Sequence, residues 1–182
     1  MSNYKRLFID NSYLFITIVT SQRKPILINN IEILRKAFEN TKKVYDFEII
    51  AAVILPEHMH IIIQPRNIKE YPKIIHAVKY YFSKKMQDDG GIVIPPYIEE
   101  SKLKKGDKGI WQRRYFEHTI RDETDLHNHL DYIHYNPVKH GHVNNVKDWK
   151  FSSFDKFVEM KNYDVDWGSA DDVKHIEEYD YD

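Results

Sequence analysis

The sequence of 182 residues contains no cysteine. Disulfide bonds, cysteine-ligated zinc sites and thiol nucleophiles are therefore excluded from its chemistry. Long apolar runs are missing too: no stretch approaches the roughly 20 residues of a membrane span, and the N-terminal segment has no signal-peptide core. We therefore expect a cytoplasmic protein with no membrane partner. The length fits one domain with an ordinary hydrophobic core.

A strong net charge is also missing, but the total of −1 hides two parts of opposite sign. Residues 155–182 carry 10 acidic residues against 3 lysines, whereas residues 1–154 carry 24 Lys and Arg against 18 Asp and Glu. We expect one folded domain over 1–154 and an acidic C-terminal tail over 155–182. The basic body suits contact with phosphates, although an ordinary solvated surface can have the same charge. The acidic tail would compete with phosphates for the basic body.

The spacing of apolar residues predicts an α+β domain. The expected elements are, in order, a strand at 12–20, a helix at about 29–44, strands at 47–55 and from His58, a helix from Pro72, and a strand from about Tyr115. The segment Gln87–Gly109 has no sustained periodicity and predicts a long loop. The order βαββαβ is that of a ferredoxin-like sheet with both helices on one face.

Two histidines, His58 and His60, stand two apart at the start of the third strand. Residues i and i+2 of a strand point to the same face, so both imidazoles project together while Met59 and Ile61 face a core. Neutral imidazole is the commonest metal ligand in proteins, and the pair is therefore half of a divalent-metal site. Two surface histidines on a half-buried strand would give the same pattern.

A further helix, expected after the fourth strand, carries His129, Tyr132 and Asn136 on a face beside its apolar stripe. Tyr132 and Asn136 are four residues apart and lie one above the other, so they can bring a nucleophile and a third metal ligand together. A core tyrosine with a bonded hydroxyl is the alternative. We expect Pro137 to end this helix.

Three motifs in this order closely resemble those of the REP-associated tyrosine transposases, a branch of the single-tyrosine HUH transposases. They are Leu-Pro-Glu-His-Met-His from Leu55, Trp-Gln-Arg-Arg-Tyr-Phe-Glu-His from Trp111, and Asp-Tyr-Ile-His-Tyr-Asn-Pro-Val-Lys-His-Gly from Asp131. The resemblance covers roughly residues 1–154, which it identifies as a catalytic domain. It implies the family fold, in which the last helix carries the catalytic tyrosine.

The resemblance also implies the site residues. His58 and His60 would bind the metal, Asn136 would complete its ligand set, and Tyr132 would be the nucleophile. Nitrogen and oxygen ligands without a thiolate suit Mg²⁺ or Mn²⁺. The implied reaction is cleavage and transfer of single-stranded DNA at REP-type hairpins through a 5′-phosphotyrosine intermediate. A monomer and a homodimer are both compatible with the sequence. One of the nearby histidines, at positions 118, 129 and 134, could help to deprotonate Tyr132.

Four cations, Arg113, Arg114, Arg121 and Lys79, are candidates for contacts with DNA, and each could equally be a surface charge. Two other functions remain open. An RNA-recognition type of domain has the same order of elements and binds single strands on aromatic residues without cleaving them, which fits the aromatic content of 14% but not the His-x-His pair. A phosphohydrolase would use a metal-activated water and leave Tyr132 structural.

Overall fold

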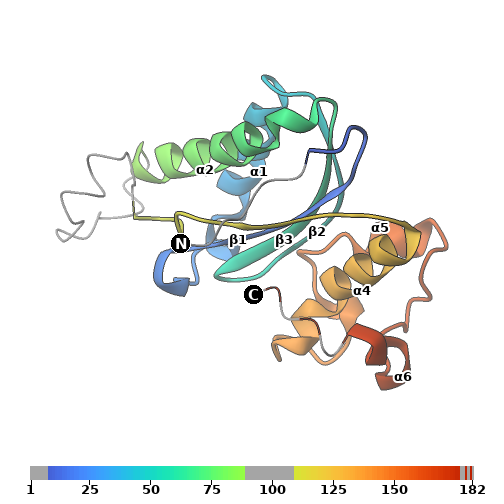
Figure 1. The fold of residues 1–182 in the computed structure, drawn as a ribbon. Coiled ribbons are helices and arrows are strands. Elements are labelled where there is room, and N and C mark those ends of the chain that lie inside the picture. Colours follow the sequence, from blue (N-terminus) through green and yellow to red (C-terminus); the bar gives the residue numbers. More distant parts are fainter. Residues whose placement is uncertain (1–7, 89–108, 177–178, 180, 182) are drawn as a thin grey trace, which may run out of the picture.

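The fold, seen in a computed structural model, is described for residues 8–88, 109–176, 179 and 181. Its centre is a four-stranded antiparallel sheet in the order β2-β3-β1-β4 (Figure 1). The strands are β1 Leu14–Val19, β2 Phe47–Ile54, β3 His58–Pro65 and β4 Phe116–Thr119. The predicted α+β class and ferredoxin-like order are confirmed, with strand ends within two residues of those expected.

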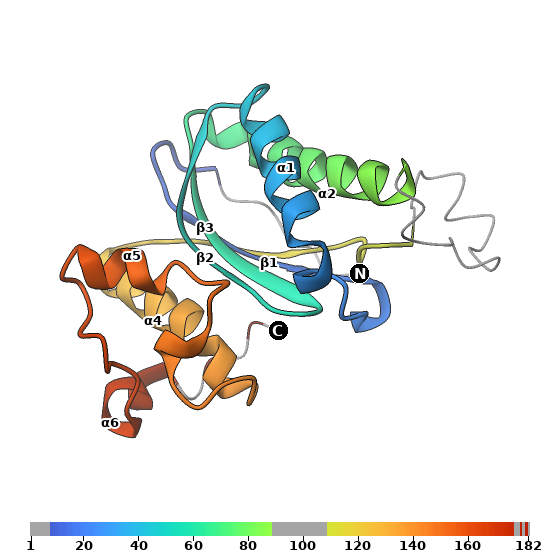
Figure 2. The same cartoon turned by 180° about the vertical axis from the view of Figure 1, so that it is seen from behind.

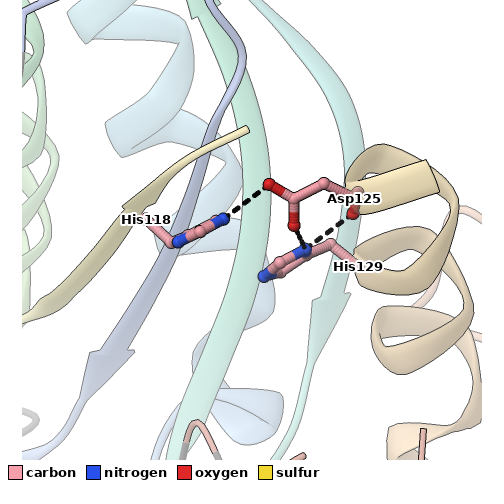
Figure 3. A group of neighbouring side chains, drawn as sticks. All are labelled: His118, Asp125 and His129. Carbon is pink, nitrogen blue, oxygen red and sulfur yellow. Dashed lines mark hydrogen bonds and ion pairs between the residues drawn. The ribbon is translucent and has the colours of Figure 1, made fainter. Parts of the chain in front are cut away.

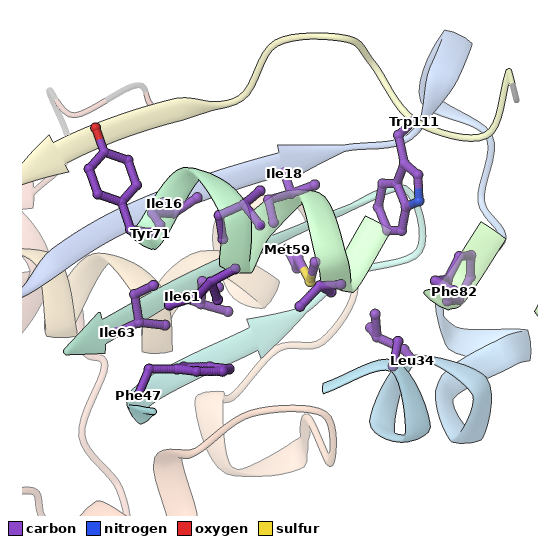
Figure 4. Packing of buried hydrophobic residues seen from close by; sticks show 14 of the residues in the cluster. Ile16, Ile18, Leu34, Phe47, Met59, Ile61, Ile63, Tyr71, Phe82 and Trp111 are labelled. Atoms are coloured by element: carbon purple, nitrogen blue, oxygen red, sulfur yellow. The ribbon is translucent and has the colours of Figure 1, made fainter. Parts of the chain in front are cut away.

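One face of the sheet is covered by the two predicted helices, α1 Ile31–Lys42 and α2 Tyr71–Asp88. Apolar side chains at helical spacing pack there on Ile16 of β1 and on Met59 and Ile61 of β3 (Figure 4). Phe82 of α2 stacks at a tilt on Trp111, which closes one end of this core. All residues of β1 and all residues of β3 except Gln64 are buried, because a second layer covers the other face of the sheet as well.

The second layer lies on the opposite side of the sheet (Figure 2). It contains the long helix α4 Glu123–Lys139, the short helices α5 Phe154–Glu159 and α6 Ala170–Val173, and the segments between them. Phe15, Val53 and Ile62 project from the sheet into this layer and meet Ile133 of α4. Alternate residues of β3 therefore face different layers, and His58 and His60 face α4.

Helix α4 does not end at Pro137 as predicted from the sequence. Pro137 removes one backbone hydrogen bond and crowds the preceding turn, yet the helix continues through Lys139. The end is set by Gly141, whose φ of 69° is one that glycine adopts without strain. Its N–H donates to the carbonyl of Val138, and the N–H of His142 donates to that of Pro137, the bond pattern of a Schellman cap.

The remaining described parts are short 3₁₀ helices and connections. The 3₁₀ helices are Ser21–Arg23, Ile28–Asn30, Ile68–Glu70, Val146–Asp148 and Lys174–Ile176. Of the predicted loop Gln87–Gly109, residues 89–108 lie outside the described part. In the C-terminal segment Phe157 is buried and Trp167 packs on Tyr163, whereas Val165 is exposed. None of the helices described has the length and apolarity needed to cross a bilayer.

Candidate active site

His58 and His60 lie next to each other on the sheet face that α4 covers. Both side chains are fully buried, and their ring centroids are 4.9 Å apart with planes at 79°. The prediction that both imidazoles share one face, with Met59 and Ile61 on the other, is confirmed. The interpretation as two surface histidines is wrong, because α4 and the segments around it exclude both rings from solvent.

The Nδ1 atom of each imidazole has a neighbour that fixes the ring. Nδ1 of His60 is 2.8 Å from Oγ1 of Thr17, and Nδ1 of His58 is 3.0 Å from Oε1 of Glu57. Such partners orient a metal-ligating histidine and direct its Nε2 to the ion. Sequence reasoning missed both. Thr17 is opposite His60 in the β1–β3 ladder, and a hydroxyl inside an otherwise apolar strand was the available signal.

Tyr132 faces the same pair from α4. Its ring centroid is 5.2 Å from that of His60, and its side chain is buried. The phenol oxygen accepts hydrogen bonds from Nζ of Lys139 at 3.4 Å and from the backbone N–H of Tyr181 at 3.2 Å. The Lys139 ammonium also lies 4.8 Å from the centre of the Tyr132 ring. One chain thus supplies both the histidine pair and the tyrosine.

Asn136 occupies the next turn of α4 and is fully buried. Residues four apart on a helix share a face, and the residues one turn before and after Asn136 both contact the histidine pair. Tyr132 stacks edge-on against His60, and the ring of His140 is 5.1 Å from that of His58. Within the described part of the chain, neither atom of the Asn136 amide has a hydrogen-bond partner.

This donor set fits a divalent ion. A buried amide without a hydrogen bond costs free energy unless another ligand satisfies it. An amide oxygen together with two imidazole nitrogens matches the preferences of Mn²⁺, and Mg²⁺ accepts the oxygen. His140 is a further imidazole beside the pair that sequence reasoning did not assign to the site.

A second group of titratable residues lies where β4 meets the start of α4 (Figure 3). One carboxylate, that of Asp125, is 2.8 Å from Nε2 of His118 and 3.0 Å from Nδ1 of His129. Two ligands of one tetrahedral zinc ion would be about 3.3 Å apart, given bonds of about 2.0 Å. The shorter separations here are those of hydrogen bonds. The three residues therefore form a hydrogen-bonded network. Their ligand atoms all lie within 4.8 Å of one another, which is also close enough to hold a cation.

The charges of this network follow from burial and hydrogen bonding. Burial lowers the pKa of His129, which favours its neutral form. Burial alone would raise the pKa of Asp125, but hydrogen bonds from His118 and from the Arg121 N–H hold it below the ordinary value. His134 lies apart from this network, bonded to Ser153, and burial lowers its pKa to about 3.

The four cations proposed for DNA contact do not form one cluster of bonded groups. Arg113 and Arg114 are exposed just before β4, and Arg121 is exposed just after it. Lys79 is half-buried on α2 and donates to the backbone carbonyl of Gln112 at 2.8 Å. Only Arg114 lines a cavity beside the histidine pair.

Comparisons with known proteins show the family and the overall fold. The family described as "Transposase IS200 like" matches residues 9–136. An Escherichia coli protein named a REP-associated tyrosine transposase is 36% identical, over 92% of this chain and 91% of its own. A Haemophilus influenzae protein, provisionally given the same name, is 43% identical over 96% and 97% of the two chains. A solved structure, described as a REP-associated tyrosine transposase bound to a REP hairpin, superposes with a TM-score of 0.78 and 32% identity. It covers 100% of this chain and 96% of that one.

Proposed function

The chain belongs to the IS200-like transposase family, and we propose that it cleaves and rejoins single-stranded DNA through a covalent bond to Tyr132. The substrate proposed is a REP-type hairpin, by analogy with the DNA in the related structure. Residues 1–154 would form the catalytic domain, and residues 155–182 the acidic tail. The observation that carries the proposal is the contact between Tyr132 and His60, with Asn136 on the same helix face.

The proposed metal ligands are His58, His60 and Asn136, and the ion is Mg²⁺ or Mn²⁺. When bound, it would polarise the scissile phosphate, whose negative charge otherwise repels a nucleophile. Thr17 and Glu57 hold the two imidazoles in place through Nδ1, so the site is organised before substrate arrives. Exclusion of water by α4 strengthens every charge interaction in the site.

The nucleophile is the phenol oxygen of Tyr132. A free phenol has a pKa near 10 and must lose its proton as it attacks. The Lys139 ammonium, 3.4 Å away, stabilises the negative charge that develops on that oxygen. The new bond joins the oxygen to phosphorus, the bond from phosphorus to the 3′-oxygen breaks, and that oxygen takes up a proton. One phosphoester replaces another, so the reverse reaction joins strands without ATP.

A covalent-adduct assay tests this proposal. The protein is incubated with a hairpin oligonucleotide labelled on the 5′-phosphate side of the cut, in the presence of Mn²⁺, and is then denatured. We expect label on the parent protein and none on Tyr132→Phe, which removes only the hydroxyl. Tyr135→Phe is the matched control, because it lies on the same helix at a position turned away by about 60°, and it should form the adduct normally.

The outcomes separate the three functions. An adduct on Tyr132→Phe equal to that of the parent would refute the assignment of the nucleophile. Cleavage without an adduct in the parent would indicate a metal-activated water and hence a phosphohydrolase. Tight binding of single strands with neither cleavage nor adduct would indicate a non-catalytic binding domain of the RNA-recognition type.

A further inference from the structure

A cavity of about 410 Å³ opens beside the histidine pair, between the end of β1 and the segment that leads into β4. Two of its lining residues, Thr17 and Arg23, link the cavity to the histidine pair. Thr17 hydrogen-bonds His60, and Arg23 is 3.7 Å from the Glu57 carboxylate that holds His58. A ligand in the cavity would therefore be linked to His60 through one residue, Thr17, and to His58 through two, Arg23 and Glu57. Its volume is within the range of small-molecule sites, about 300–1,000 Å³.

The chemistry of the lining suits one nucleotide of a single strand. Arg23 and Arg114 supply two cations for a phosphate, and Gln112 supplies an amide that can donate to and accept from the edge of a base. Phe116 supplies an aromatic face and is 42% exposed, which is unusual for a phenylalanine. No carboxylate is found among the described residues that line the cavity.

A planar ring already stacks on Phe116. The side chain of Tyr181, near the C-terminus, lies with its centroid 5.3 Å from that of Phe116 and with the two planes at 29°. This is the offset stacking that a base adopts on an aromatic side chain. The backbone N–H of the same residue donates to the phenol oxygen of Tyr132. A ring in this position therefore lies in the cavity while the chain next to it reaches the proposed nucleophile.

We propose that this cavity binds a nucleobase of the DNA strand adjacent to the scissile phosphate, stacked on Phe116 in the place that Tyr181 occupies. The inference rests on the proposed function, since it takes the substrate to be single-stranded DNA. The base displaces Tyr181, Arg114 and Arg23 contact the flanking phosphate, and Gln112 meets the edge of the base. The tail residue and the base compete for one surface.

Substitutions of the two stacked rings should have opposite effects on binding. Phe116→Ala removes the surface on which the base stacks and should weaken the affinity for a hairpin with a single-stranded flank by about 5- to 100-fold. Tyr181→Ala removes the competitor and should raise the affinity. Tyr80→Ala is the matched control, because Tyr80 is 45% exposed on α2 and does not line the cavity. Arg114→Ala should weaken binding more than Arg113→Ala.

The test places 2-aminopurine at each position of the flank in turn and records its fluorescence on binding. The experiment contains no metal and all proteins keep Tyr132, which holds the backbone of Tyr181, so a failure of the proposed cleavage chemistry does not affect this result. We expect quenching at one position, and loss of that quenching with Phe116→Ala. An abasic nucleotide at that position should abolish the difference in affinity between Phe116 and Phe116→Ala proteins.

The proposal is overturned if no position is quenched, or if Phe116→Ala costs the same affinity whether or not the base is present. Equal losses would mean that Phe116 only supports the fold. Should Phe116→Ala fail to fold, Phe116→Leu keeps apolar bulk without an aromatic face and carries the same expectations. Weaker binding by Tyr181→Ala would also count against competition between tail and base.

Discussion

Acid should destabilise this protein in a way that can be traced to His134. The ring is fully buried among Phe154, Phe157 and Tyr163, with centroids 5.0 to 5.7 Å away. Its Nε2 is 3.0 Å from Oγ of Ser153, which also accepts the N–H of Ala52 in β2. Burial lowers the pKa of His134 from 6.5 to about 3, because a charged imidazolium would lose its hydration there.

The sign and size of the effect follow from proton linkage. The unfolded chain takes up a proton on this residue near pH 6.5, whereas the folded chain does not until about pH 3. The contribution of neutral His134 to the free energy of unfolding is therefore fully present above pH 6.5 and is lost as the pH drops towards 3. With these two values the loss is about 2 kcal/mol between pH 7 and pH 5, and about 1 kcal/mol more by pH 4.

The assay is urea unfolding at several pH values for the parent and for His134→Phe, which fits an aromatic cluster and does not titrate. The stability of the variant should fall by about 2 kcal/mol less than that of the parent between pH 7 and pH 5. Phe154→Leu is the control, because it loosens the same cluster without changing a titrating group. Its curve should run parallel to that of the parent. Equal pH slopes for the parent and His134→Phe would refute the reasoning.

Three further predictions concern the site, the tail and the backbone. Thr17→Val removes the hydrogen-bond partner of His60 and should weaken Mn²⁺ binding by about 10- to 100-fold in calorimetry, whereas Thr119→Val should not. Deletion of the residues beyond Trp167 should raise the affinity for random single strands at low salt, most simply by removing acidic charge; unchanged affinity would contradict this. Gly168→Ala should lower the free energy of unfolding by about 1–3 kcal/mol, since φ is 114° and a Cβ would lie 2.7 Å from Val146; Gly141→Ala, with open space around it, should cost less.

Predictions from the sequence were correct where the periodicity of a strand or helix, or a short motif, determines the local structure. The alternation around His58 and His60 correctly placed both imidazoles on one face, and the helical spacing of Tyr132 and Asn136 placed them one turn apart. These are local properties of the chain. The end of α4 was predicted wrongly because Pro137 is a weaker stop signal in a last turn than Gly141 is at a cap.

Contacts between distant segments could not be predicted in the same way. Thr17 meets His60 only because of the register between β1 and β3, which no local pattern specifies. The network of Asp125 with His118 and His129 joins a strand to a helix, and the individual residues gave no sign of it. The C-terminal segment was predicted from its charge, whereas the stacking of Tyr181 on Phe116 depends on a fold that charge does not encode.

The alternation along β3 also limits how this chain can change length in the course of evolution. Ile61 and Ile63 pack in one core while His58 and His60 face the other layer, so inserting a single residue between them would turn one of the two sets to the wrong face. The sheet accommodates one extra residue elsewhere, in a β-bulge of β2. The β2–β3 register shifts there between Ile49 and Ala51, before β2 reaches the position opposite His60. Insertions and deletions in related chains should therefore collect at that bulge and in loops. The stretch from His58 to Ile63 should keep its length.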